Sequence, residues 1–323
     1  MADLQPHGPA MGQKDGVLEE RRNQKRTAAA DLQPTISKSD SLLGIPHADW
    51  LQPQWPGPAG VHALCTTRAG GVSTGPYASL NLGGHVGDAP SAVQANRQLL
   101  QTAVQCATPG ARPVFLNQVH GTVVADINRA TPDGPEADAC VATQPGAVCT
   151  IMAADCLPVL LAHGSGAMVG AAHAGWRGLA GAQGVGVLEA VFERFSALAS
   201  ADKAPSAIKN QSSDALTAHT MAWLGPCIGP TAFEVGAEVR EAFCRHQPAA
   251  QACFVPQGQG KFLADLAGLA RLRLRALGVT QIYGNDSSAQ WCTVGNASRF
   301  FSYRRDHLAL GGSGRMAACI WRA

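Results

Sequence analysis

Residues 147–178 read AVCTIMAADCLPVLLAHGSGAMVGAAHAGWRG, and this stretch contains three short apolar runs with almost no charge between them. The runs are 147–153, 159–162 and 167–172, and each begins directly after a Gly or Pro. Short apolar runs bounded in this way predict strands that are buried on both faces. Residues 178–198 follow with apolar side chains at helical spacing, so the segment predicts an α/β fold.

The same patterns extend outward from this segment in both directions. They predict strands at 61–67, 114–119, 122–127, 221–224, 300–303 and 316–321, and helices at 89–106, 235–245 and 263–277. Residues 200–218 are polar and predict a surface loop or insertion, and the three arginines of 263–277 are expected on a solvated helix face. The mixed-charge residues 1–44 predict a disordered tail, which leaves 45–323 as a single catalytic domain.

The composition limits the kind of partner. The chain has 323 residues, a net charge of +2 and 46% hydrophobic residues, so it has ample core material and no global field to attract nucleic acid or a membrane. Its ten cysteines form no CxxC pair, and no apolar run has the length of a membrane span or an export signal. We therefore expect a cytoplasmic protein with a small-molecule partner, while the oligomeric state stays open.

Three motifs each bring one metal-binding side chain to the edge of an apolar run. These are His120 in NQVHG (117–121), Cys156 in ADCLP (154–158) and His173 in AHAGWRG (172–178). Because strand ends gather at the edge of a sheet, where open α/β sheets place their ligands, the three side chains are expected to meet. Two imidazoles and a thiolate suit zinc or copper, and three protein ligands leave the vacant position of a catalytic site. The motifs therefore predict an enzyme.

Other polar residues near these motifs are candidates for further roles. Asp155 precedes Cys156 and would either orient a ligand and handle a proton, as a catalytic group, or cap a backbone turn. Arg68, in a Gly-rich turn, and Arg177, at a helix entrance, are the candidates for binding phosphate, with an ordinary salt bridge as the alternative. The segment SYRRD at 302–306 is expected to form structural ion pairs.

The chain resembles the laccase-domain family, once labelled polyphenol oxidases and now regarded as zinc-dependent purine nucleoside phosphorylases. The resemblance runs from about residue 45 to the end and rests on ordered motifs. They are TTRAGGVS at 66–73, NQVHG at 117–121, ADCLPVLLA at 154–162, AAHAGWRG at 171–178, GPCIGPTAFEVG at 225–236 and FFSYRRD through GRMA at 300–317.

This resemblance implies a single-domain α/β/β/α-type sandwich with mixed sheets, a fold type shared with cysteine hydrolases. It also implies one zinc per chain held by His120, Cys156 and His173, with copper as an alternative ion. The implied reaction is phosphorolysis of adenosine, inosine, guanosine or methylthioadenosine to the base and (methylthio)ribose 1-phosphate, with adenosine deamination as a companion activity. A purine nucleoside and phosphate are then the expected partners.

Two rival functions use the same residues. A multicopper oxidase needs closely spaced imidazole pairs, whereas none of the ten histidines here forms an HxH motif; a single copper at the three ligands would still allow weak polyphenol oxidase activity. A cysteine hydrolase or deamidase would use Cys156 as nucleophile and His173 or His120 as base. Metal content distinguishes the hydrolase from the phosphorylase.

Overall fold

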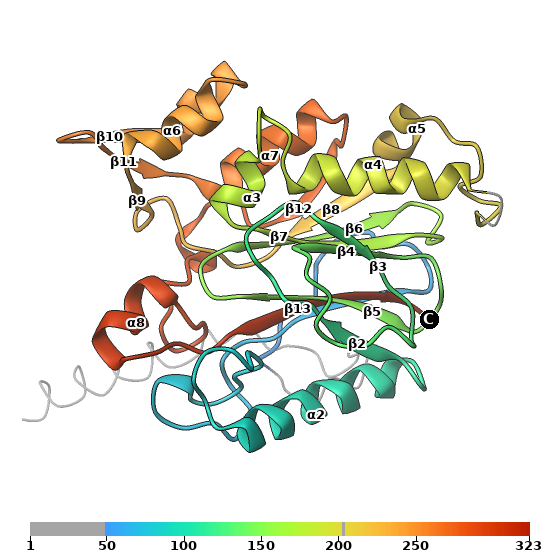
Figure 1. The fold of residues 1–323 in the computed structure, drawn as a ribbon, viewed down its shortest axis with the longest axis horizontal. Coiled ribbons are helices and arrows are strands. Elements are labelled where there is room, and N and C mark those ends of the chain that lie inside the picture. Colours follow the sequence, from blue (N-terminus) through green and yellow to red (C-terminus); the bar gives the residue numbers. More distant parts are fainter. Residues whose placement is uncertain (1–48, 202–203) are drawn as a thin grey trace, which may run out of the picture. The chain divides into compact units, whose positions relative to one another are not determined.

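The three apolar runs form one strand of a four-stranded sheet and two neighbouring strands of a six-stranded sheet. They become strands β5 (Ala147–Ala153), β6 (Leu157–His163) and β7 (Val169–Ala174), and every residue in them is buried. The structure is a computed structural model that describes residues 49–201 and 204–323 (Figure 1). The predicted tail at 1–44 lies outside the described residues.

The remaining elements follow in chain order around these strands. The other strands are β1 (Val61–Cys65), β2 (Arg112–Phe115), β3 (Val124–Asp126), β4 (Ala139–Ala142), β8 (Thr220–Leu224), β9 (Glu234–Val235), β10 (Phe254–Gly258), β11 (Lys261–Ala264), β12 (Gln281–Gly284) and β13 (Met316–Arg322). The helices are α2 (Pro90–Ala107), α3 (Trp176–Ala180), α4 (Val187–Ser200), α5 (Ser213–Ala218), α6 (Ala237–Cys244), α7 (Leu266–Ala276) and α8 (Tyr303–Leu310), with 3-10 turns η1 (Gly75–Tyr77), η2 (Pro248–Cys253) and η3 (Ala289–Trp291).

Both large sheets mix parallel and antiparallel pairs. One has the order β1-β13-β5-β2, in which only β2 and β5 are parallel. The other has the order β12-β8-β6-β7-β4-β3, in which the outer pairs β12/β8 and β3/β4 are parallel. A small third sheet, β10-β11-β9, is separate from both. The predicted α/β class with mixed sheets in one domain is therefore confirmed.

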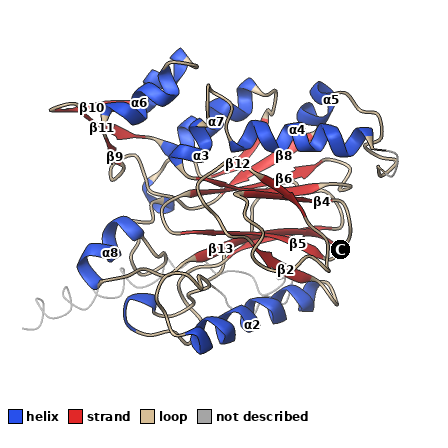
Figure 2. Ribbon diagram, viewed as in Figure 1, coloured by secondary structure: helices blue, strands red, loops and turns tan. Residues whose placement is uncertain are grey.

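The two large sheets pack face to face, and helices cover their outer faces (Figures 1 and 2). Strand β6 shows how the sequence produces this arrangement: Leu160 faces the other sheet in a cluster with Ile151 and Ile320, whereas Leu161 faces the helix layer. Helices α3, α4 and α7 lie on that outer face, and α2 lies against the four-stranded sheet. The layers thus run helix, sheet, sheet, helix, which explains why the central strands have no polar face.

Three helical predictions need correction. The helix predicted at 178–198 is two helices, α3 and α4, because the glycine-rich turn 181–186 interrupts it. Residues 200–218 are not only a polar loop, since they include α5 and bury Leu216 in the core. Arg273 of α7 is 5% exposed and pairs with Glu189, and Arg271 donates to backbone carbonyls, so neither has the predicted solvated position.

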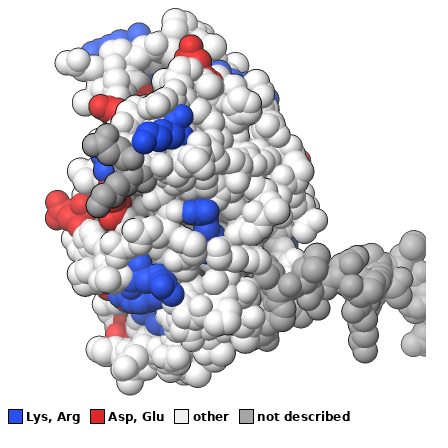
Figure 3. Space-filling model, turned by 90° about the vertical axis from the view of Figure 1, so that its right-hand side faces the viewer, with Lys and Arg blue, Asp and Glu red and all other residues white. Residues whose placement is uncertain are grey.

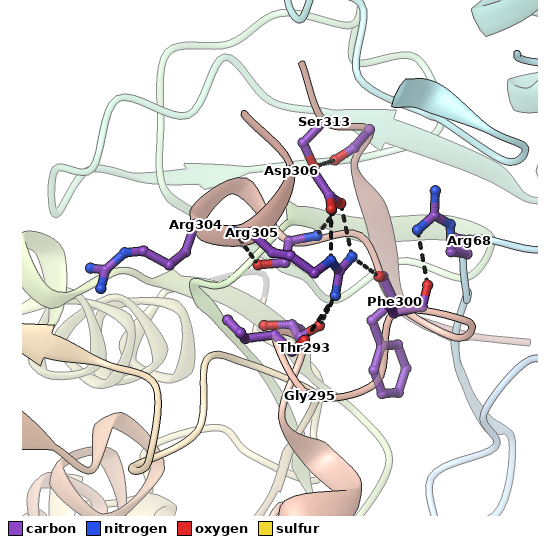
Figure 4. A network of polar contacts seen from close by, with 12 residues as sticks. Arg68, Thr293, Gly295, Phe300, Arg304, Arg305, Asp306 and Ser313 are labelled. Atoms are coloured by element: carbon purple, nitrogen blue, oxygen red, sulfur yellow. Dashed lines mark hydrogen bonds and ion pairs between the residues drawn. The ribbon is translucent and has the colours of Figure 1, made fainter. Parts of the chain in front are cut away.

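The strand predicted at 300–303 is also wrong, because this segment leads into helix α8. Ser302 caps the helix by accepting a hydrogen bond from the N–H of Arg305, and Asp306 accepts one from the N–H of Ser302. Such reciprocal side-chain bonds favour a helix start over a strand. The predicted structural pairing in 302–306 is confirmed by the ion pair between Arg305 and Asp306 (Figure 4).

One face of the described molecule carries few charges. On the face shown in Figure 3, basic and acidic side chains of the described residues form small separate groups within a largely uncharged surface. Among the described helices, none is both long enough and apolar enough to cross a bilayer.

Replacing Ile151 by Ala tests the interface between the two sheets. Ile151 is 0% exposed in the cluster between them, and deleting three buried carbons from such a site is expected to lower the free energy of unfolding by about 2–5 kcal/mol. Urea denaturation measures the change. Leu308→Ala is the control, because Leu308 is 93% exposed and its truncation should change stability by less than about 0.5 kcal/mol. Equal effects of the two substitutions would contradict the described core.

Candidate metal centre

His120 lies in a loop that is fastened to the neighbouring strand β5. The side chain of Gln118 holds the loop through two hydrogen bonds to the backbone of Met152, both 2.8 Å long. Nε2 of Gln118 donates to the carbonyl oxygen of Met152, and Oε1 of Gln118 accepts from the N–H of Met152. His120 itself has a φ of 63°, which is uncommon for a residue other than glycine. This backbone therefore needs outside support.

That support comes from the carboxylate of Asp138, which is 0% exposed and immediately precedes β4. Asp138 accepts hydrogen bonds from the backbone N–H groups of Val119, His120 and Gly121, at 3.1, 2.9 and 2.7 Å. The same carboxylate lies 2.8 Å from Nδ1 of His173 on β7. Asp138 therefore fixes both the loop of one imidazole and the ring of the other.

The contact with Asp138 also determines which ring nitrogen of His173 can bind a metal. An ionised carboxylate only accepts hydrogen bonds, so Nδ1 carries a proton, and in the neutral form of His173 that binds a metal the free lone pair is on Nε2. A histidine ligand commonly donates its second ring N–H to a carboxylate in this way. His173 is 4% exposed and therefore has little freedom to turn.

Cys156 lies in the tight turn between β5 and β6, next to Asp155, whose φ is 90°. Both carboxylate oxygens of Asp155 accept hydrogen bonds of 2.6 Å, one from Oγ1 of Thr293 and one from the backbone N–H of Arg304 near the start of α8. These contacts correspond to the capping alternative for Asp155. They leave its catalytic role a prediction.

The ligand atoms of His120, Cys156 and His173 all lie within 4.8 Å of one another, and no other group of this kind occurs in 49–201 and 204–323. Sγ of Cys156 is 3.6 Å from Nε2 of His120. A tetrahedral zinc with a sulfur at about 2.3 Å and a nitrogen at about 2.0–2.1 Å would separate the two ligands by roughly 3.5 Å. The donor set therefore suits one zinc or copper ion, and the distance between Cys156 and His120 matches two ligands of one tetrahedral zinc.

Gly175 makes room for this cluster at the end of β7. A Cβ atom at this position would lie 2.8 Å from Cδ2 of His120 and 3.0 Å from Sγ of Cys156. Such contacts would push both ligands away. The glycine of the AHAGWRG motif is thus required by the close approach of the two ligand side chains.

The electrostatics of the cluster favour the ligand form of the thiol. Burial raises the pKa of Cys156, but the positive charge of His173 and hydrogen bonds with His120 and His173 outweigh it and lower the pKa to about 6. Burial lowers the pKa of His173, but the thiolate and Asp138 outweigh it and raise the pKa to about 9. Burial also raises the pKa of Asp138, yet its hydrogen bonds from His173 and the N–H of Gly121 lower it overall. Without a metal, the cluster is therefore a thiolate–imidazolium pair at neutral pH.

The cluster forms part of the wall of a cavity of about 550 Å³, a size typical of small-molecule sites. Its lining combines the three ligands with apolar, aromatic and basic side chains. The other lining residues are His85, Gln118, Met152, Ala153, Ala154, Asp155, Trp176, Ile228, Phe233, Leu266, Tyr303, Arg304 and Arg315. The candidate metal centre therefore lies in the wall of a largely apolar cavity that also has basic side chains in its lining.

The two arginines predicted to bind phosphate do not line the cavity. Arg68 donates from Nε to the carbonyl oxygen of Ala78 and from Nη1 to that of Ala297, and it lies over the ring of Phe301. Arg177 is exposed on α3, where it lies over the ring of Trp176. Arg68 therefore holds loops together, and the structure does not bring either arginine to the three ligands.

Comparison with known proteins identifies the family. Residues 62–323 match the family described as multi-copper polyphenol oxidoreductase laccase. The chain belongs to this family. It is 46% identical over 275 residues to "Purine nucleoside phosphorylase PA4543" from Pseudomonas aeruginosa, and 46% identical over 271 residues to "Purine nucleoside phosphorylase YfiH" from Escherichia coli. Each match covers 84% of this chain and 98% of the relative.

Two solved structures have the same fold as this chain. The Neisseria meningitidis protein NMB0706 matches with a TM-score of 0.70 and 45% identity over 85% of this chain and 99% of its own. YlmD from Geobacillus stearothermophilus matches with a TM-score of 0.69 and 31% identity over 85% of this chain and 96% of its own. The word multi-copper in the family's description implies several metal ions per protein. The described residues of this chain form one group of three metal-binding side chains.

Asp138→Asn tests the carboxylate that joins the two histidines. An amide cannot accept from His173 and from all three backbone N–H groups at once, so the ligands lose their common anchor. Metal affinity is expected to fall by about 10–100-fold, measured by competition with a chromophoric chelator. Asp133→Asn is the control, because Asp133 pairs with Arg97 and Arg112 at the surface. An unchanged affinity in folded Asp138→Asn protein would contradict the assigned role.

Alkylation tests the thiolate in metal-free protein. At pH 7 iodoacetamide should modify Cys156 in preference to Cys319, because burial raises the pKa of Cys319 to about 12. With a pKa of about 6 for Cys156, its thiolate fraction and alkylation rate should fall about tenfold between pH 7 and pH 5. Mass spectrometry of the labelled peptides gives the rates. Zinc should protect Cys156, and a rate independent of pH over this range would contradict the thiolate.

Proposed function

We propose that this chain is a zinc-dependent purine nucleoside phosphorylase that acts on adenosine, inosine, guanosine or methylthioadenosine. The observation that carries the proposal is the position of His120, Cys156 and His173 on the wall of a cavity large enough for a nucleoside. The names of the relatives support the substrate class. In the reaction, a phosphate oxygen bonds to C1′ of the ribose as the C1′–N9 bond breaks, and the base departs with the bonding electrons and takes up a proton.

The chain's own residues would perform three tasks in this reaction. His120, Cys156 and His173 would hold the ion, which supplies a Lewis acid when bound. Asp138 would keep both imidazoles in place, so the site would need no rearrangement when substrate enters. Trp176 and Phe233 would offer aromatic faces in the cavity wall for the purine.

Deamination of adenosine belongs to the same proposal as a companion activity. In that reaction water supplies the oxygen that replaces the C6 amino group, and ammonia leaves. Asp155 lies in the cavity wall beside Cys156 and would be the nearby carboxylate for proton transfer. Both carboxylate oxygens of Asp155 already accept a hydrogen bond, which makes this carboxylate less available for proton transfer.

A cysteine hydrolase is the second candidate, and one observation favours it. Cys156, His173 and Asp138 form a chain of thiolate, imidazolium and carboxylate, which is the arrangement of an activated cysteine nucleophile. The fold type that the sequence resembles is also shared with cysteine-dependent deamidases. In this alternative, metal removal would leave activity intact, and alkylation would abolish it.

Product analysis tests the proposal. Zinc-loaded protein incubated with inosine should release hypoxanthine and ribose 1-phosphate only when phosphate is present, as resolved by chromatography. Cys156→Ala removes the sulfur ligand, so it should lose zinc and at least about 100-fold of the activity while the fold remains. Cys106→Ala, an exposed cysteine on α2, is the matched control and should keep both.

Two results would contradict a phosphorylase that depends on zinc held by Cys156. One is full phosphorolysis by the Cys156→Ala variant, and the other is hydrolytic activity in metal-free protein that iodoacetamide abolishes. The second result would establish the cysteine hydrolase instead.

A further inference from the structure

Arg315 lines the cavity and keeps part of its guanidinium available there. The side chain donates only through Nη1, to the carbonyl oxygens of Ser313 at 3.0 Å and Gly314 at 3.1 Å. Within 49–201 and 204–323, neither Nε nor Nη2 has a hydrogen bond, and no carboxylate forms an ion pair with it. Arg315 is therefore a cavity-lining cation with donors that no protein group occupies.

Arg315 is fixed in place by the loop that carries His85. The buried side chain of Asn81 accepts hydrogen bonds through Oδ1 from the backbone N–H of Arg315 and from that of Gly83, both at 2.9 Å. A Cβ atom on Gly83 would lie 2.8 Å from Cγ of Arg315, so only glycine leaves space for the arginine's stem. Asn81 and Gly83 thus join the loop and the arginine into one unit.

His85 lines the same cavity, and its pKa is lowered, which favours the neutral imidazole. Burial lowers its pKa first, and the positive charges of Arg315 and Arg97 lower it further. A neutral imidazole can donate one hydrogen bond without repelling the guanidinium. Arg315 and His85 therefore offer donors of two kinds next to one another.

The other charged groups near Arg315 are already engaged. Burial lowers the pKa of Arg315, whereas the negative charges of Cys156 and Asp155 raise it. Asp155 is bonded to Thr293 and to the N–H of Arg304, and Cys156 belongs to the metal cluster. Arg304, the second arginine of the lining, directs Nη1 and Nη2 to the carbonyl oxygens of Ala232 and Glu234. Arg315 is thus the arginine of the lining whose paired Nε and Nη2 donors have no protein partner among the described residues, whereas both Nη atoms of Arg304 are engaged.

We propose that Arg315 and His85 form an oxyanion subsite in the cavity and that it receives inorganic phosphate, the nucleophile of phosphorolysis. The inference rests on the proposed function and names the residues that bind its second substrate. A guanidinium presents paired N–H groups that match the oxygens of a phosphate. The subsite and the three metal ligands line one cavity, so phosphate and nucleoside would meet there.

Direct binding of inorganic phosphate to zinc-loaded protein, measured by calorimetry without nucleoside, tests the subsite. Arg315→Met keeps the apolar stem and removes the charge, and it should raise the Kd for phosphate about tenfold or more. Arg315→Lys should recover part of that loss. His85→Ala, in an exposed position, should raise the Kd about fivefold even if Arg315→Met folds poorly. Arg245→Met, on an exposed arginine that pairs with Glu241, should leave the Kd unchanged.

Steady-state kinetics separates phosphate binding from a general structural defect. In Arg315→Met the KM for phosphate should rise about tenfold while the KM for inosine changes less than about twofold. An equal rise in both KM values would indicate a structural defect and overturn the assignment. Unchanged Kd values in both Arg315→Met and His85→Ala would also overturn it.

Adenosine monophosphate distinguishes free phosphate from a phosphate ester as the natural occupant. Inorganic phosphate should bind in an Arg315-dependent manner, and the nucleotide should bind no more tightly than adenosine. Nucleotide binding that is tighter and depends on Arg315 would keep the oxyanion subsite and overturn inorganic phosphate as its occupant. If the protein shows no phosphorolysis but still binds phosphate through Arg315, the proposed function is wrong and the phosphate subsite stands. If phosphorolysis occurs and does not depend on Arg315, the proposed function stands and the subsite is wrong.

Discussion

The buried carboxylate of Asp138 is the group on which the metal centre depends. It accepts hydrogen bonds from three backbone N–H groups in the loop of His120 and from one ring N–H of His173. One carboxylate therefore supports the left-handed backbone at His120 and orients the His173 ring. It also raises the pKa of His173, whose positive charge in turn lowers the pKa of Cys156. Because a carboxylate buried without partners would be costly, these four bonds also hold the loop to the sheet.

The sandwich of two sheets explains how three distant segments supply one cluster. Strands β6 and β7 are antiparallel, so the start of β6, beside Cys156, lies next to the end of β7, which carries His173. Gln118 fastens the loop of His120 to β5 in the other sheet. The cluster therefore lies where the two sheets meet at one edge, and helix α8, whose N-terminus is bonded to Asp155, borders the same cavity.

The sequence predicted the central strands and the three ligand candidates because apolar runs and soft ligands are local signals. Asp138 carried only the weak signal of one acid within an apolar stretch, and its partners come from residues 17 to 35 positions away. The Gly-rich turn at Arg68 suggested phosphate binding; two backbone carbonyl groups engage Nε and Nη1 of this arginine, and its phosphate role stays a prediction. Aromatic residues at 300–303 resembled a strand, whereas side-chain capping by Ser302 and Asp306 starts a helix. Neither the long-range contacts of Asp138 nor the local capping bonds of Ser302 and Asp306 leave a periodic pattern of apolar residues.

X-ray absorption at the zinc edge of protein purified without added metal tests the three-ligand zinc centre. Such protein should contain about one zinc per chain, with one sulfur at about 2.3 Å and two imidazole nitrogens at about 2.0–2.1 Å. The sulfur should disappear from the shell in Cys156→Ala protein to which zinc has been added back. A shell of oxygen and nitrogen alone in the unmodified protein, or zinc at a small fraction of one per chain, would contradict a metal centre built from His120, Cys156 and His173.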